Sequence, residues 1–289
     1  MSSYVPELAV ITLIAAVVNG ALGYGFSSIT VPLALLFLTN RVLNPALVLV
    51  EVALNGYVLW VNRDALGAVR RRMFPIVAGL VPGVVIGTLI VTHVHPDWLK
   101  LGTFTLLLPL ILLQAAGYRR PIQSERSIGF PFGTGVGLLY SLTTISGPPL
   151  ALILNNQGFA KRDFRAALGF VRLAEATFTA MAYAYAGLFT RASLGLTPTI
   201  VPSLLIGVPV GAWLIRRIDA ETFRRVCMSF DAWVVGFGIS TLLRSVHLVE
   251  GSEAYAVLAA VILVDVLLLY RFFSAPRPPQ LALSESVTR

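Results

Sequence analysis

Long runs of apolar residues, separated by short basic stretches, make up most of the chain. The runs lack the alternation of polar and apolar residues that marks a half-buried strand. At 1.5 Å per residue, a helix of about 20 residues crosses the roughly 30 Å hydrocarbon layer of a bilayer. We therefore expect full membrane spans in seven stretches: residues 45–62, 74–92, 99–116, 165–187, 196–215, 226–243 and 254–273.

Two further apolar segments are interrupted by glycine, proline and hydroxyl residues. Residues 5–38 break at NGALGYGFSSITVP, and residues 128–156 break at SLTTISGPP. Each arm is too short to cross a bilayer alone. If each segment were one kinked span, two strongly basic loops would lie on opposite faces of the membrane, against the positive-inside rule. We interpret both segments as re-entrant hairpins that enter and leave at the same face.

Composition and charge place the chain in a membrane and orient it. Of its 289 residues, 56% are hydrophobic and 12% are charged, whereas about 25% are charged in an ordinary soluble domain, which excludes a soluble enzyme. The net charge of +8 could indicate a nucleic-acid partner, but the basic residues fall in clusters between spans. With two hairpins, 17 of them lie on one face and 4 on the other. This predicts an N-terminus outside the cell membrane and a cytoplasmic C-terminus, with clusters such as ETFRR (221–225) at the lipid head groups.

The two halves of the chain resemble each other in inverted orientation. The tetrapeptide PLAL follows the break in both halves, and an offset of 124 residues superposes further matches. Because each half contains one hairpin and three spans, the odd number of crossings turns the second copy upside down. Inverted repeats with broken helices in matching positions are typical of secondary transporters, whose substrate site lies near the bilayer midplane. The matched pairs are Gly83/Gly207, Gly87/Gly211 and Glu51/Glu175.

We therefore predict an all-α polytopic membrane protein built from an inverted internal repeat. The first repeat covers residues 1–118 and the second covers 127–245, each with one broken, re-entrant element followed by three spans. An additional span covers residues 254–273, and residues 274–289 are expected to form a disordered cytoplasmic tail. The four-residue spacing of the repeat glycines indicates close helix packing rather than a ligand site.

The sequences NGALGYGFSSITVPLAL and GTGVGLLYSLTTISGPPLAL, with the glycine pairs that follow them, resemble the TauE/SafE (TSUP) family of sulfite and organosulfonate transporters. The resemblance covers about residues 5–245. It implies export or import of sulfur-containing anions and related small carboxylates, coupled to an ion gradient. We expect an exporter of sulfite, sulfonates or related oxyanions driven by the proton gradient. A small-anion channel and a carboxylate transporter stay open as alternatives.

The broken segments supply candidate ligands for an anion. A break exposes helix N-terminal N–H groups beside hydroxyl side chains, and both suit an oxyanion without a metal. The alternative is that the hydroxyls only bond back to helix carbonyls. The candidates in the first half are Asn19, Tyr24, Ser27, Ser28 and Thr30, and those in the second are Ser141, Thr143, Thr144, Ser146 and Asn155, with Asn156 beside it.

Five charged residues at interior positions of the predicted spans are candidates for a role: Arg172, Glu51, Glu175, Asp231 and Asp265. Arg172 would supply positive charge for the substrate, because a charge within a bilayer is costly unless it faces a partner or water. Alternatively, it forms an intrahelical ion pair with Glu175, three residues on. Glu51 and Glu175 are candidate coupling residues, since a carboxylate shielded from water can take up a proton; alternatively, Glu51 pairs with Asn55. Asp231 and Asp265 are expected to make helix contacts.

The chain lacks the motifs of several other function classes. It has no GxSxG or HExxH sequence and no Walker-type loop, so we expect neither an enzyme nor direct ATP drive. His93 and His95 have no accompanying cysteine or carboxylate set, so we expect no metal and no other cofactor. The expected partners are a small anionic substrate and the lipid bilayer, without nucleic acid. A homodimer stays open.

Overall fold

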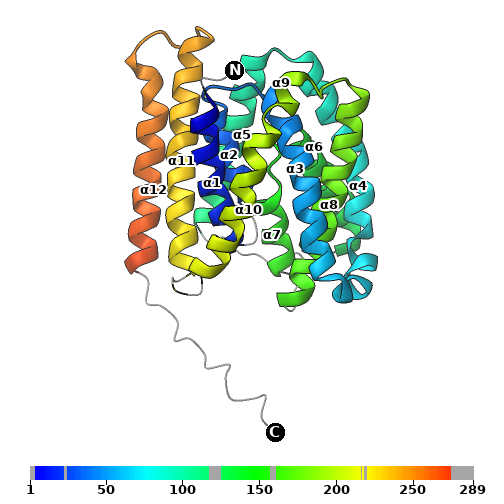
Figure 1. The fold of residues 1–289 in the computed structure, drawn as a ribbon. Helices are drawn as coiled ribbons and strands as arrows, with labels where there is room; N and C mark the ends of the chain where they lie inside the picture. The colour runs from blue at the N-terminus through cyan, green and yellow to red at the C-terminus, as the bar shows by residue number, and fades with distance from the viewer. Residues whose placement is uncertain are drawn as a thin grey trace.

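The protein is described by a computed structural model that covers residues 4–22, 25–116, 125–156, 161–215, 217 and 220–274. These residues form helices joined by short turns, with no strand among them, which confirms the all-helical prediction. Figure 1 shows one bundle in which α1 begins at one end and α12 ends at the other. The helices are α1 (Val5–Leu22), α2 (Phe26–Ala34), α3 (Asn40–Val61), α4 (Leu66–His93), α5 (Pro96–Ala115), α6 (Glu125–Thr143), α7 (Gly147–Asn156), α8 (Lys161–Tyr185), α9 (Arg191–Leu194), α10 (Thr197–Leu214), α11 (Ala220–Ser245) and α12 (Ala256–Ser274).

Six helical stretches of the described residues are long and apolar enough to cross a membrane. They overlap six of the seven predicted spans. The seventh, residues 165–187, lies mostly in α8, which has 25 residues but is the least apolar of the long helices, because Arg172, Glu175 and a basic first turn interrupt its apolar residues. The six stretches are Asn40–Val61, Arg63–His93, Pro96–Leu113, Arg191–Leu214, Arg225–Ser245 and Ser252–Ser274.

Both interrupted segments are pairs of helices separated by a break. Gly25, directly before α2, has a left-handed φ of 105°. Thr144, directly after α6, has a φ of 55°, which is uncommon for a β-branched residue. The second arms, α2 and α7, have only 9 and 10 residues. In Figure 1, α1 starts at the end of the bundle where α3 begins and α2 returns toward it, whereas α6 and α7 start and return at the opposite end.

Glycines hold the longer arm of each broken segment against a helix of the other half. The most extensive helix contacts are those of α4 with α6 and of α1 with α10. A Cβ added at Gly79 would overlap the backbone of Phe130, and one at Gly83 would overlap that of Thr134. The backbones of α4 and α6 therefore touch, and the two helices run in the same direction. Gly211 of α10 approaches the backbone of Val17 in α1 as closely, so the packing interpretation of the repeat glycines is confirmed.

The helix ends that carry basic clusters lie together. The starts of α4, α6, α8 and α11 and the ends of α10 and α12 share one end of the bundle (Figure 1). Arg41, at the start of α3, lies at the other end. Its guanidinium donates to the carbonyls of Val91 (2.8 Å), Thr92 (2.7 Å) and Val94 (2.9 Å), where α4 terminates. Arg41 thus satisfies carbonyls that the helix end leaves free.

One basic residue does not behave as its cluster predicts. Arg225, expected at the lipid head groups, is only 2% exposed. Its guanidinium donates to the carboxylate of Asp265 at 2.8 Å and to the hydroxyl of Ser229 at 3.2 Å. The correction has a simple cause, because α12 packs on α11 and brings a buried carboxylate opposite Arg225. Asp265 makes the helix contact that its position in a span predicts.

Candidate functional site

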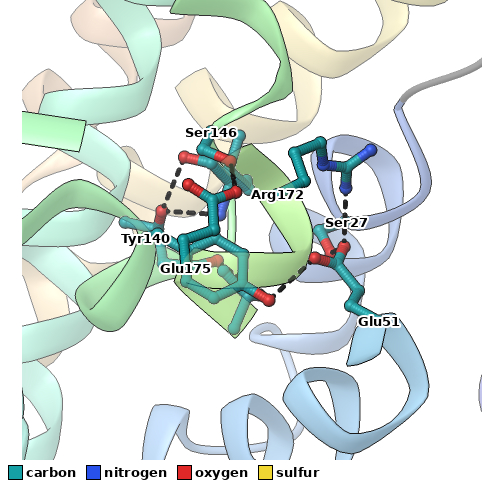
Figure 2. Close-up of polar contacts among 9 residues, drawn as sticks. Ser27, Glu51, Tyr140, Ser146, Arg172 and Glu175 are labelled. Carbon is teal, nitrogen blue, oxygen red and sulfur yellow. Dashed lines mark hydrogen bonds and ion pairs between the residues drawn. The ribbon is translucent and has the colours of Figure 1, made fainter. Parts of the chain in front are cut away.

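Three apolar clusters form the core of the bundle: one is built mainly by α1, α2, α3, α5, α10 and α11, another by α4, α6, α7 and α8, and the third, which includes Tyr140, by residues of α3, α4, α5, α6 and α8. Glu51, in the middle of α3, is fully buried there. Its Oε1 accepts hydrogen bonds from the Ser27 hydroxyl at 2.5 Å and from Arg172 Nη2 at 3.1 Å. Its Oε2 accepts one from the Tyr140 hydroxyl at 2.8 Å. One carboxylate therefore joins α2, α3, α6 and α8 (Figure 2).

The second glutamate has a related environment. Glu175, also fully buried, lies on α8, and its Oε1 accepts a hydrogen bond from the Ser146 hydroxyl. Its Oε2 has no partner among the described residues. Ser27 and Ser146 both lie at the start of the short returning helix of their segment. Each break therefore places a serine hydroxyl on the glutamate of its own half (Figure 2).

Arg172 connects the halves. It is 4% exposed and forms an ion pair with Glu51, across the interface of α8 and α3. The alternative of an intrahelical pair with Glu175 is not what the structure contains, since the guanidinium is directed at Glu51 (Figure 2). Nor does Glu51 pair with Asn55, whose Nδ2 has no partner among the described residues. Arg172 Nε is likewise buried without a described partner, so the guanidinium has a donor to spare.

Protein side chains donate hydrogen bonds to the backbone carbonyls that the second break leaves free. The Leu142 carbonyl, at the end of α6, accepts hydrogen bonds from Nδ2 of Asn40 (3.3 Å) and of Asn44 (2.7 Å). The Ser141 carbonyl accepts one from the Tyr183 hydroxyl. Carbonyls freed by a break must find such partners wherever water is excluded. These contacts fix the position of the break beside α3 and α8.

The predicted anion ligands fall into several groups in the structure. Ser27 and Ser146 donate to the glutamates, so they hold carboxylates in this state. The hydroxyls of Ser141, Thr143 and Thr144 bond to nearby backbone carbonyls, as the alternative interpretation describes. The remaining candidates are not engaged in this way: Asn19 Oδ1 and Thr30 Oγ1 are buried without a described partner, Ser28 is half-buried, Tyr24 lies outside the described residues, and the side chains of Asn155 and Asn156 are likewise not described.

Sequence reasoning missed several residues of the centre. Tyr140 lies four residues before the second break and is separated from Glu51 by 89 positions, so no local pattern joins them. Asn40 and Asn44 are spaced one helical turn apart at the start of an apolar span. Polar residues with that spacing are a usable signal, since a span has little other reason to carry two amides.

The centre is suited to binding and to proton transfer. A guanidinium with a free N–H, three hydroxyls and two carboxyl groups meet where two helices are broken. Among the described residues, no group of three or more His, Cys, Asp or Glu side chains could hold a metal ion. The groups present can therefore form hydrogen bonds to an anion and exchange a proton at a carboxylate.

A family model with the description "Sulfite exporter TauE/SafE" matches residues 8–236. The matched range contains both breaks and every residue of the centre, and it ends within α11, before α12 begins. No curated protein matches the chain. No solved structure matches it either.

Proposed function

The chain belongs to the TauE/SafE family of sulfite exporters, a family of membrane transporters rather than enzymes, and on that premise we propose that it is a secondary transporter of small anionic sulfur compounds. Sulfite, sulfonates and related oxyanions are the proposed substrates, export is the proposed direction, and the proton gradient is the proposed driving force. The observation that carries the proposal is the buried Arg172, held by a carboxylate between the two broken segments. A charge in such a place is a functional group by default.

The packing of the helices supports an inverted repeat over residues 1–118 and 127–245. The helices α1 to α5, without the short 3₁₀ turn, have counterparts in α6, α7, α8, α10 and α11 in the same order. In both halves the longer broken arm packs against the fourth helix of the other half, α1 on α10 and α6 on α4. Gly211 approaches α1 as Gly87 approaches α6. This arrangement is typical of carriers with a site at the repeat interface.

The proposed substrate contacts follow from the chemistry of an oxyanion. The planar guanidinium of Arg172 can donate two N–H groups to two oxygens of a sulfite or sulfonate. Hydroxyl and amide groups near the two breaks would complete the shell. The proposed shell comprises Asn19, Tyr24, Ser27, Ser28, Thr30, Ser141, Thr143, Thr144, Ser146 and Asn155 together with Arg172.

Glu51 and Glu175 are the proposed proton carriers. Both are fully buried, and desolvation penalises the ionised form of a carboxyl group. Each is bonded to a hydroxyl at the start of a returning helix. Protonation would therefore change the contacts between the glutamate and the broken segment of its own half.

Flux measurements with purified protein in liposomes test the proposal. We expect saturable sulfite or sulfonate flux that responds to an imposed pH gradient. Arg172→Ala should weaken apparent substrate affinity by about tenfold to a hundredfold, because a hydrogen bond to a charged group contributes about 1.5–3 kcal/mol. Arg244→Ala, which removes an exposed arginine at the far end of α11, is the matched control and should leave the flux unchanged.

Other outcomes of the same measurement favour the alternatives. Unsaturated flux proportional to concentration would identify a small-anion channel. Competition by acetate or another small carboxylate, without competition by sulfite or sulfonates, would identify a carboxylate transporter. Full substrate affinity in Arg172→Ala would remove this residue from the site.

A further inference from the structure

We propose that Glu51 occupies the position of the transported anion on Arg172, so that the substrate and this carboxylate compete for one guanidinium. The inference rests on the proposed function and names how the same site is regulated. It follows from the contacts of Glu51 rather than from its burial alone.

The donors around Glu51 are those that an oxyanion needs. A hydroxyl, a phenol and a guanidinium, from Ser27, Tyr140 and Arg172, converge on its two oxygens at 2.5–3.1 Å. These donors come from α2, α6 and α8, so both broken segments contribute. A carboxylate and a sulfonate both carry their negative charge on closely spaced oxygens, so the same three donors can form hydrogen bonds to either group.

The charges of the centre disfavour binding of the anion while Glu51 is ionised. With both glutamates ionised, two negative charges face one positive charge, and a bound anion would add a third. Two like charges about 4 Å apart repel by about 4 kcal/mol even at an effective dielectric constant of 20. The anion can therefore bind well only when a proton neutralises Glu51 and releases Arg172.

The remaining titratable groups near α3 do not substitute for Glu51. Tyr140 of α6 and Arg172 and Glu175 of α8 face the centre. The helices α2 and α10 carry no titratable side chain. The charged or titratable residues that α4, α5 and α9 contribute lie near helix ends, namely Arg70, Arg71, Arg72, His93, Asp97, Lys100 and Arg191.

Proton and anion therefore occupy the site together. Lower pH on one side of the membrane increases the fraction of protein with a neutral Glu51 and a free Arg172. Apparent affinity scales with that competent fraction, so anion binding should strengthen as pH falls. Without the carboxylate, binding should no longer depend on pH.

The test is anion-induced stabilisation of the purified full chain in detergent, measured as a shift in melting temperature at several pH values. The probes are sulfite, thiosulfate and methanesulfonate, used separately; methanesulfonate keeps one negative charge throughout, so its pH dependence reports on the protein. We expect Glu51→Gln to bind the effective probe at least about tenfold more tightly at neutral pH, with a flat pH profile. Glu253→Gln, exposed between α11 and α12 and away from the centre, is the matched control, since it removes an equal charge but leaves Glu51 on Arg172, and it should keep the pH dependence.

Glu51→Asp provides a second variant in case Glu51→Gln does not fold. It keeps a carboxylate and all three donors but shortens the side chain by one methylene, which weakens its contact with Arg172, so we expect anion affinity to rise by about threefold to tenfold at neutral pH. Equal or weaker affinity in the folded Glu51→Gln protein, or in Glu51→Asp if the first variant is not folded, would overturn the competition while leaving the transporter proposal intact. Absence of stabilisation by every probe in wild type and variants alike would overturn both.

Discussion

At the scale of single residues, the centre depends on groups that the breaks bring to two buried carboxylates. Ser27 reaches Glu51 and Ser146 reaches Glu175 because each serine lies where a short helix starts. A buried carboxylate that loses such a donor keeps its desolvation cost without the compensating bond. Small changes of backbone angle beside these serines should therefore affect both stability and transport.

Gly25→Ala tests this dependence. Gly25 has a φ of 105°, which any residue with a Cβ adopts only at a cost of about 1–2 kcal/mol. We expect a loss of stability of this size in detergent unfolding, with reduced transport because Ser27 follows two residues later. Gly102→Ala is the control: nothing lies within 4 Å of its added Cβ, so stability should stay equal or rise. Unchanged stability in Gly25→Ala would show that the break can relax.

The residues of the centre could be predicted from the sequence only in part. Glu51 and Glu175 emerge from the repeat because both fall at the same offset inside apolar runs. The partner of Arg172 could not be predicted, since Glu175 lies one helical turn away and local geometry alone favours that pair. Packing of α8 on α3 decides the matter and brings Glu51 closer. Tyr140 was missed for the same reason.

At the scale of helices, α12 follows the two proposed repeats. It lies outside the residues matched by the family model, and its most extensive contacts with another helix are those with α11. Arg225 and Asp265 form a buried ion pair in that interface at 2.8 Å. In an apolar surrounding such a pair fixes the register of two helices, because any shift would leave both charges unpaired.

Arg225→Met and the double variant Arg225→Met/Asp265→Leu test this role. The single variant leaves a buried carboxylate without its partner, and we expect it to lose about 3–5 kcal/mol of stability. The double variant removes both charges and should recover most of that loss. Unfolding by increasing denaturing detergent measures both. A double variant as unstable as the single one would contradict this prediction. It would mean that α12 needs the ion pair itself, and not only the absence of an unpaired buried charge.

The breaks in the helices could be predicted from the sequence, but the surroundings of the helices could not, and the reason is physical. Breaks in the two interrupted segments were predictable because glycine and proline act through the local backbone. The apolar character of α8 was overestimated because a polar helix can be enclosed by others, and hydropathy along one segment does not report its neighbours. Arg225 was placed at the lipid head groups for the same reason, since its partner is 40 residues away.

At the scale of the whole molecule, the distribution of charge between the two ends of the bundle predicts its orientation in the membrane. The basic starts of α4, α6 and α8 share one end only because each broken segment returns to the end at which it begins, α1 and α2 at one end and α6 and α7 at the other (Figure 1). The positive-inside rule then predicts that this end is cytoplasmic. The start of α1 and the turn between α11 and α12 lie at the other end, which is predicted to face outward.

Labelling of single cysteines from one side of the membrane tests that orientation. Cys227 is the chain's single cysteine, so a Cys227→Ala background makes each introduced thiol unique. Ser252→Cys, exposed between α11 and α12, should react with a membrane-impermeant maleimide in intact cells. Gly67→Cys, exposed at the basic start of α4 with nothing within 4 Å of its Cβ, should react only after the cells are opened. The reverse pattern would mean that the protein has the opposite orientation in the membrane. Reaction of both thiols in intact cells would contradict the placement of the bundle across the membrane. Because the proton gradient has a fixed direction in a cell, the result also decides which end of the centre is loaded at lower pH.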